Sequence, residues 1–222
     1  MLQPTTLKFL KQLALHNNKP WFDDNRKQYE AARENFTSLV DEMLLLQAIQ
    51  DKVYSNFTAK DCMFRINRDV RFSKDKTPYK QNFSAYFCAG GKKSPLAGYY
   101  FHLEPGKSFV AAGMWYPEAP LLKKLRQEID YSYDEFRNII YNKKFKATFG
   151  ELERTPDITL QREPKGYEKD NPAIEFLKLK SLLVTKPLTD AEVYDEKLAK
   201  KIVDTFTIAT PFVNFLNRAV TD

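Results

Sequence analysis

The sequence has few of the residues that build metal centres and disulfide frameworks. It contains two cysteines, Cys62 and Cys88, and two histidines, His16 and His102, in 222 residues. Neither cysteine belongs to a Cys-x-x-Cys pair and the histidines lie far apart in the chain, so we expect no metal. A metal site built from carboxylates alone stays open. Two cysteines are too few to staple a chain of this size, and we expect reduced thiols on neighbouring strands of a cytoplasmic protein.

Long apolar runs are also missing. No stretch approaches the roughly 18 apolar residues that a membrane-spanning helix requires. The apolar run from Phe9 to Leu15 is interrupted by Lys11 and Gln12, and no small-residue cleavage site follows it. The sequence therefore predicts neither a transmembrane segment nor a secretory signal.

Glycine is scarce, and the glycine motifs of common enzymes are absent. The chain has 7 glycines, with no Gly-x-Ser-x-Gly elbow, kinase motif set or dinucleotide fingerprint. The pair Gly90-Gly91 lacks the spacing of a Walker loop and predicts an ordinary loop. We expect no cofactor, and the motifs leave open whether the protein is an enzyme.

Aromatic residues and positive charge are plentiful. The chain carries 17 Phe, 12 Tyr and 2 Trp, with a net charge of +6 and a pI near 9.1. A chain of this length buries a substantial core. The basic balance favours acidic partners, which include phosphates, nucleic acid and anionic membrane.

The stretch from Cys62 to Cys88 concentrates this charge. Apolar and polar residues alternate from Phe64 to Phe72 and again from Phe83 to Phe87, which is the period of half-buried strands. Between positions 65 and 80, six cations against Asp69 and Asp75 leave a net charge of +4. The six cations are Arg65, Arg68, Arg71, Lys74, Lys76 and Lys80.

The same stretch resembles a known family. The run from Phe64 to Lys80, with its Arg-Asp-Val-Arg-Phe-Ser-Lys-Asp-Lys-Thr-Pro-Tyr-Lys core, is similar to the signature of a large bacterial and fungal family known only as a domain of unknown function. The resemblance extends to two other groups of residues, so it covers nearly the whole chain. These are Trp21-Phe22 with Asn25 and Tyr29, and Pro164-Lys165-Gly166-Tyr167 with Asp170 and Pro172. It implies positions of interest and no activity.

The arrangement of elements predicts an α+β fold in a single domain over 1–222, with a largely antiparallel sheet of four or more strands flanked by N-terminal and C-terminal helices. We expect a helical part at 1–50, a sheet-rich part at 60–115 and a helical or mixed part at 116–222. Pro105-Gly106 predicts a tight turn between strands 98–104 and 107–113. Alternation along the first strand places Tyr99, Phe101 and Leu103 on its buried face and Tyr100, His102 and Glu104 on the other. The expected helices cover 4–15, 20–48, 117–130, a segment capped by Ser132, 172–179 and the C-terminal region, where Pro211 should interrupt or kink the helix.

The basic segment predicts a cationic cleft that binds a phosphorylated or other anionic small ligand. Arginine binds phosphate and carboxylate well because its planar fork donates two parallel hydrogen bonds. The alternative is that these arginines pair internally with Asp69, Asp75 or a distant carboxylate. The candidate ligand-binding residues are Arg65, Arg68, Arg71, Lys74, Lys76, Tyr79, Lys80, Arg162, Lys165 and Tyr167.

Two further hypotheses stay open. Tyr79, Phe83 and Tyr86 interleave with basic residues, as in proteins that bind nucleic acid by stacking. An enzyme acting on a phosphorylated metabolite or nucleotide is the third hypothesis, with Asp69 and His102 as its candidate acid or base. We also expect an ordered loop from Arg71 to Lys80, anchored in the core by Phe72 and Tyr79.

The turn Pro164-Lys165-Gly166-Tyr167 is expected to fold over the 65–80 segment and complete one cleft. Gly166 permits a turn with positive φ that lets backbone approach closely, and Tyr167 adds an amphipathic wall. The alternative is that this turn only precedes the helix at Pro172. Its cations would then pair with neighbouring acids, Glu163, Glu168 and Asp170.

Overall fold

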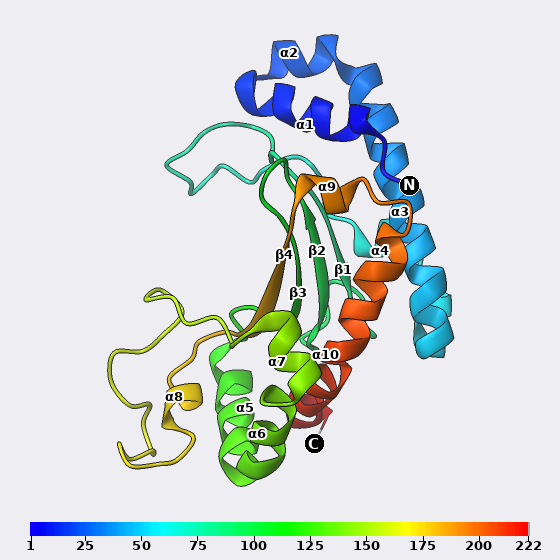
Figure 1. Cartoon of the computed structure of the whole chain (residues 1–222). Coiled ribbons are helices and arrows are strands. Elements are labelled where there is room, and N and C mark those ends of the chain that lie inside the picture. Colours follow the sequence, from blue (N-terminus) through cyan, green and yellow to red (C-terminus); the bar gives the residue numbers. More distant parts are fainter. Residues whose placement is uncertain (222) are drawn as a thin grey trace. The chain divides into compact units, whose positions relative to one another are not determined.

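The computed structural model describes residues 1–221, and over these residues the fold is α+β (Figure 1). A four-stranded antiparallel sheet has the strand order β1-β2-β3-β4. Helices precede and follow it in the sequence, which confirms the predicted fold class. The strands are β1 (Phe83–Phe87), β2 (Gly98–Leu103), β3 (Ser108–Met114) and β4 (Leu182–Leu188).

The chain groups into two compact units. Unit 1 comprises Met1–Phe87, Tyr100–Val110 and Pro187–Asp204. Unit 2 comprises Cys88–Tyr99, Ala111–Lys186 and Thr205–Asp222. Strands β2, β3 and β4 and the helix α10 contribute residues to both units. That the whole chain folds as one domain stays a prediction.

Unit 1 begins with three helices, and the first has the predicted bounds. The prediction of one helix over 20–48 was wrong, because the chain turns at Asn25, whose φ is −104° and ψ 16°. The Asn25 side chain donates to the Trp21 carbonyl at 2.9 Å, and Asn18 accepts from the Trp21 amide at 3.0 Å. The Asn18 bond caps the start of α2, whereas the Asn25 bond to the backbone competes with helix continuation. The helices are α1 (Pro4–Leu15), α2 (Lys19–Asp24) and α3 (Arg26–Gln50).

Helix α3 covers one face of the strands in unit 1. The ring of Phe36 stacks on Phe83 of β1 at 5.4 Å and on Phe101 of β2 at 5.8 Å, and all three side chains are buried. Burying a side chain of this size contributes about 1.5–3 kcal/mol. Because side chains alternate along a strand, Tyr100 and His102 of β2 lie on the opposite face, as predicted.

The turn between β2 and β3 has the predicted form. The Lys107 amide donates to the Glu104 carbonyl at 3.0 Å, and Gly106 has a φ of 72°. A glycine with positive φ at the third position is typical of a type II turn. The Gly106 amide also donates to Asp190 at 2.8 Å. Asp190 opens α9 (Asp190–Val193), which Thr189 and Glu192 cap.

Two short helices lie between α3 and the basic segment, and they correct the prediction for the cysteines. They are η1 (Lys52–Asn56) and α4 (Ala59–Cys62). Cys62 ends α4 and is therefore not on a strand, and Met63 pairs with Ala85, so Cys88 does not stand opposite Cys62. Both residues are buried thiols, in agreement with the expected reduced state.

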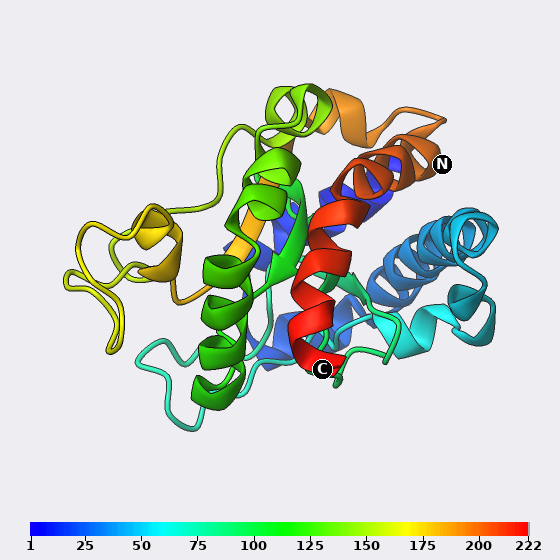
Figure 2. The ribbon, with the colours of Figure 1, turned by 90° about the horizontal axis from the view of Figure 1, so that it is seen from below.

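Unit 2 contains a helical layer in which aromatic rings meet. The ring of Phe136 in α6 lies 5.2 Å from Phe215 and 6.3 Å from Phe212, both in α10. Figure 2 shows this part of α10 (red) beside α5 and α6 (green). The helices are α5 (Ala119–Tyr131), α6 (Tyr133–Ile140), α7 (Lys143–Phe149), α8 (Ile174–Leu177) and α10 (Leu198–Thr221).

Two details of these helices differ from the predictions. Ser132 precedes α6 without the expected capping box, because its φ of −107° and ψ of 36° do not place its side chain on the helix amides. Pro211 lies inside α10 and does not interrupt it, so of the two predicted effects only the kink stays a prediction. Within residues 1–221, none of the helices is both long enough and apolar enough to span a bilayer.

Gly113 lets strands β3 and β4 approach closely. Its φ is 125°, and a Cβ at this position would lie 2.1 Å from the Leu182 carbonyl oxygen. Real Cβ atoms do not tolerate that distance from backbone. The pairing of β3 with β4 therefore depends on glycine at this position.

Candidate anion site

The basic segment, called the 65–80 loop from here on, is not the long strand that its alternating pattern predicted. Only isolated bridges form, Met63 with Ala85 and Asn67 with Tyr79. The Arg68 amide donates to Pro78 at 2.9 Å, and the Lys80 amide donates to Ile66 at 2.8 Å. Beyond these bonds the chain leaves the sheet, because charged side chains form bonds within the loop and Pro78 has no amide hydrogen.

Tyr79 anchors the loop in unit 1, as predicted. Its ring is buried and stacks on Phe22 of α2 with centroids 4.0 Å apart. Asn17 forms two bonds with the Tyr79 backbone, donating to its carbonyl at 2.9 Å and accepting from its amide at 3.0 Å. Phe22 is buried in this contact, so it packs in the core and does not line a cleft.

Arg68 is the centre of the loop's internal bonding. Its guanidinium donates to the Asp75 carboxylate, to the Thr77 hydroxyl and, at 3.4 Å, to the Ser73 hydroxyl. The Thr77 amide and the Arg68 guanidinium lower the pKa of Asp75 to about 2, so this carboxylate is charged at neutral pH. The sequence left open whether Arg68 pairs internally, and it does.

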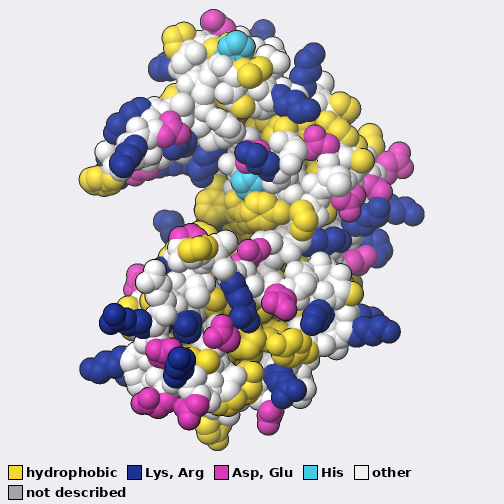
Figure 3. Space-filling view, turned by 60° about the vertical axis from the view of Figure 1, so that its left-hand side comes forward, with side chains coloured by type: hydrophobic (Ala, Val, Ile, Leu, Met, Phe, Trp, Pro, Cys, Tyr) yellow, Lys and Arg dark blue, Asp and Glu magenta, His cyan; other side chains and the backbone are white. Residues whose placement is uncertain are grey.

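Arg71 is also paired within the loop. Its guanidinium binds the two oxygens of Asp69 at 2.7 Å and 3.0 Å, which lowers the pKa of that carboxyl. Lys76 donates to the Val70 carbonyl at 2.9 Å. The prediction that Phe72 anchors the loop was wrong, because its side chain is 94% exposed. Figure 3 shows the basic side chains of the loop (dark blue) with acidic ones (magenta) between them at the upper left.

Arg65 and Lys80 differ from these paired residues. Among residues 1–221, no carboxylate lies within ion-pair distance of either side chain. Lys80 is half-buried, and its ammonium lies 5.4 Å from the centre of the Phe64 ring. Burial, together with the positive charge of Arg65, lowers the pKa of Lys80. The base of the loop therefore holds two neighbouring cations that repel each other.

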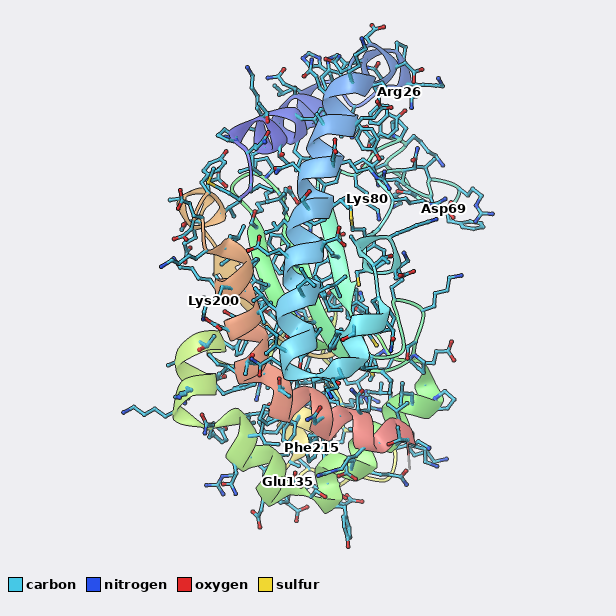
Figure 4. All side chains as sticks on the ribbon, turned by 90° about the vertical axis from the view of Figure 1, so that its right-hand side faces the viewer. Arg26, Asp69, Lys80, Glu135, Lys200 and Phe215 are labelled. Atoms are coloured by element: carbon cyan, nitrogen blue, oxygen red, sulfur yellow. The ribbon has the colours of Figure 1, made fainter. Side chains whose placement is uncertain are left out.

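The nearest acid does not neutralise this pair. The charge of Arg65 contributes to lowering the pKa of Asp69, so the two groups interact at a distance. Both oxygens of Asp69 already accept hydrogen bonds from Arg71. Figure 4 shows Asp69 farther out along the loop and Lys80 at its base. A net positive charge remains around Arg65 and Lys80.

A hydrogen-bonded chain of polar side chains lies on the sheet face opposite α3. His102 Nε2 lies 2.9 Å from Glu104, and His102 Nδ1 lies 3.2 Å from the Tyr100 hydroxyl and 3.4 Å from the Asn82 amide nitrogen. Because Glu104 only accepts, Nε2 carries the hydrogen and Nδ1 of the neutral ring accepts. Tyr100 also bonds the Ser84 side chain.

Most members of this chain were missed at the level of the sequence. The alternation of β2 placed Tyr100, His102 and Glu104 on one face, which was the available signal. Nothing in the spacing linked them to Asn82 or Ser84 of the neighbouring segment. Asp69 and His102, the two candidate acid or base residues, have no hydrogen-bond partner in common: Asp69 binds Arg71, and His102 binds Glu104 and Tyr100.

The candidates of the 162–167 segment lie in unit 2. Arg162 and Lys165 are exposed, and in the described part of the chain neither forms an ion pair with Glu163, Glu168 or Asp170. Gly166 has the expected positive φ of 95°, and a Cβ there would meet nothing within 4 Å. Glycine at position 166 is therefore needed for the backbone conformation of the turn, and no neighbouring chain approaches it closely. That this turn completes the cleft of the 65–80 loop stays a prediction.

Tyr167 has its own surroundings in unit 2. Its ring is half-buried, and burial raises its pKa, followed in size by the effect of Asp130. Arg126 donates to the carbonyls of Leu177 and Leu179 at 2.7 Å and 3.3 Å, which holds the chain after α8.

Within residues 1–221, no group of three or more His, Cys, Asp or Glu residues is placed to hold a metal ion.

The comparisons identify the family and nothing beyond it. A family model described as conserved hypothetical protein, DUF2461, matches residues 5–215. The chain therefore belongs to this family of unknown function, as the resemblance of its basic segment indicated. No curated protein and no solved structure matches the chain.

Proposed function

We propose that the protein binds a phosphorylated or other anionic small ligand at Arg65 and Lys80. The observation that carries this proposal is the pair of neighbouring cations without a carboxylate within ion-pair distance in the described residues. Of the six cations in the loop, Arg68 and Arg71 are paired internally. Lys74 and Lys76 lie in the middle of the segment, and Arg65 and Lys80 lie together at its base.

An anion at this position removes two unfavourable effects at once. Lys80 loses hydration through its partial burial, and its charge is opposed by Arg65. A phosphate oxygen restores a hydrogen-bond acceptor to the ammonium and screens the repulsion. The guanidinium of Arg65 offers parallel donors that fit phosphate geometry. Each charge-assisted hydrogen bond contributes about 1.5–3 kcal/mol.

The test is calorimetric titration with inorganic phosphate, pyrophosphate and sugar phosphates. Arg65→Met and Lys80→Met should each weaken binding by about 10- to 150-fold, which corresponds to about 1.5–3 kcal/mol. The effects of the double variant should be non-additive, since both side chains hold one ligand. Lys27→Met, an exposed cation of α3, is the matched control and should bind normally. Wild-type affinity in both site variants, or no binding by the wild-type protein at millimolar ligand, would overturn the proposal.

The polar chain on the sheet face favours an enzyme as the second candidate function. A carboxylate that holds the Nε2 hydrogen of His102 leaves Nδ1 able to accept the Tyr100 proton, which is the arrangement needed for acid–base chemistry. If this chain transfers protons, release of phosphate from a bound ester should fall at least about 100-fold in His102→Gln. Ligand affinity should change little. Equal turnover by the wild-type protein and the His102→Gln variant would exclude this role.

A further inference from the structure

A row of aromatic side chains begins next to Arg65 and Lys80. The ring of Phe64 is 37% exposed, lies beside the Lys80 ammonium and is 6.3 Å from the ring of Tyr100. Tyr100 lies 5.8 Å from Phe109 of β3, and Phe109 stacks on His102 at 4.7 Å with planes 16° apart. The four rings come from three segments of unit 1: the chain beside β1, which carries Phe64, and the strands β2 and β3.

This row is not part of the hydrophobic core between the strands and α3. Phe101, the neighbour of Tyr100 and His102 along β2, is the residue that packs on α3, so the row lies on the other face. Phe64, Tyr100, His102 and Phe109 are all partly accessible. An outward sheet face normally carries polar residues. Rings on neighbouring strands of such a face are typical of surfaces that stack nucleobases.

We propose that the anion bound at Arg65 and Lys80 is the phosphate of a nucleotide whose base stacks on this row, beginning at Phe64. The inference rests on the proposed function and adds the class of ligand. Phosphate and ring recognition lie side by side because the Lys80 ammonium is 5.4 Å from the Phe64 ring. A nucleotide carries both a phosphate and a flat base, the two groups that Lys80 and Phe64 are suited to bind.

The charges of the loop favour a free nucleotide over a nucleic-acid strand. Binding a strand requires a series of cations that contact successive phosphates. Two arginines that would extend the series, Arg68 and Arg71, hold Asp75 and Asp69 instead. Four cations of the loop hold no carboxylate within the described residues. Lys74 and Lys76 lie in the middle of the segment, where Lys76 donates to the Val70 carbonyl. The other two, Arg65 and Lys80 at the base of the loop, match the few charges of a single nucleotide.

The experiment compares nucleoside 5′-monophosphates with ribose 5-phosphate and with nucleosides by calorimetry. Nucleotides should bind at least about tenfold more tightly than ribose 5-phosphate, the range expected for stacking one base. Phe64→Leu keeps an apolar side chain and should abolish most of this preference while leaving the affinity for ribose 5-phosphate unchanged. Lys80→Met should weaken both phosphates and leave any nucleoside binding unchanged.

Controls keep the result interpretable. Tyr131→Leu removes a ring that is 91% exposed on α5 and should change nothing. Phe109→Leu is a second variant of the row, and far-UV circular dichroism of each variant checks that it is folded. A preference that survives in both folded row variants would overturn the inference.

Three outcomes separate the two proposals. Equal, Lys80-dependent binding of ribose 5-phosphate and nucleotides would reject base stacking and leave the anion site intact. Absence of binding to every phosphate compound would reject the proposed function and this inference together. A mixed-sequence oligonucleotide that binds far more tightly than mononucleotides, with affinity falling steeply with salt, would show that the ligand is a strand and reject the free nucleotide.

Discussion

His102 is held in a neutral form mainly by its burial. The loss of hydration lowers its pKa, and this effect outweighs the opposite effect of Glu104, while Lys107 lowers the pKa further. The neutral ring donates from Nε2 to Glu104 and accepts at Nδ1 from Tyr100. A neutral imidazole can take up a proton at Nδ1 from a hydrogen-bonded neighbour, which fits the position of His102 beside Tyr100 in the polar chain.

We expect the His102 pKa to lie below the ordinary value of about 6.5. In Glu104→Gln it should fall further, because the carboxylate no longer stabilises the imidazolium. Nitrogen-15 NMR titration of the imidazole measures both values, and His16→Gln assigns the signals. A wild-type value above 6.5 would show that the charge of Glu104 outweighs burial.

The same pKa fixes the sign of a stability change. Because the unfolded chain binds the proton more tightly than the folded one, this group makes the free energy of unfolding fall as pH drops below about 6.5. The loss of stability from this group ends once the pH falls below the pKa of His102 in the folded protein.

At the residue scale, alternation predicted burial better than it predicted partners. The two faces of β2 and the anchoring role of Tyr79 follow from local pattern, and both are confirmed. The pairing of Arg68 with Asp75 could not be predicted, because residues seven apart meet only through the path of the loop. Phe72 was assigned to the core from its hydrophobicity, but it lies in the part of the loop that leaves the sheet.

At the scale of elements, the 65–80 loop is ordered by one side chain more than by any other. Arg68 donates to Asp75, Thr77 and Ser73, and its own side chain is 25% exposed. We expect slow tryptic cleavage after Lys74 and Lys76 in the native protein. Arg68→Met should accelerate cleavage at both sites at least about tenfold, because local opening governs access.

The matched control is Arg71→Met. Arg71 is 75% exposed and binds Asp69 alone among carboxylates, so its loss should accelerate cleavage much less. Mass spectrometry of timed digests locates the cuts. Rapid nicking of the wild-type protein at Lys74 would contradict an ordered loop, and equal rates for the two variants would contradict the central role of Arg68.

The regular elements were predictable where the side-chain period and the turn residues agree. Helix α1 and the hairpin of β2 and β3 meet this condition. The segment 64–72 does not, because an extended chain and a strand show the same alternation until backbone pairing decides between them. The break at Asn25 was missed for a related reason: the apolar spacing continues through it, while the bond from the Asn25 side chain to the Trp21 carbonyl ends α2.

At the scale of the whole molecule, the two units share regular elements. Strands β2, β3 and β4 and helix α10 each have residues in both. We expect one cooperative thermal transition, since opening either unit breaks these elements. Differential scanning calorimetry should give equal calorimetric and van't Hoff enthalpies, about 155 kcal/mol near 60 °C for 222 residues. Two resolved transitions would contradict the single domain that the sequence predicts.

Charge was the whole-molecule property that indicated a ligand class. The net charge of +6 and the +4 of the loop predicted an anionic partner, yet neither number shows which cations are already paired. That distinction required the geometry of the loop, where Arg65 and Lys80 differ from Arg68 and Arg71. Family membership over residues 5–215 supplies no ligand, so the proposed site depends on these contacts.

The two buried thiols are natural probes of local opening, one in each unit. Cys62 lies in unit 1 and Cys88 in unit 2, and both are buried. Burial also raises the pKa of Cys88, so its reactive thiolate is rare in the closed state. A thiol reagent therefore modifies each residue mainly when its surroundings open. Each modification rate thus reports the local opening of one unit without any engineered label. Under opening-limited conditions, different rates for the two thiols indicate that the units open separately.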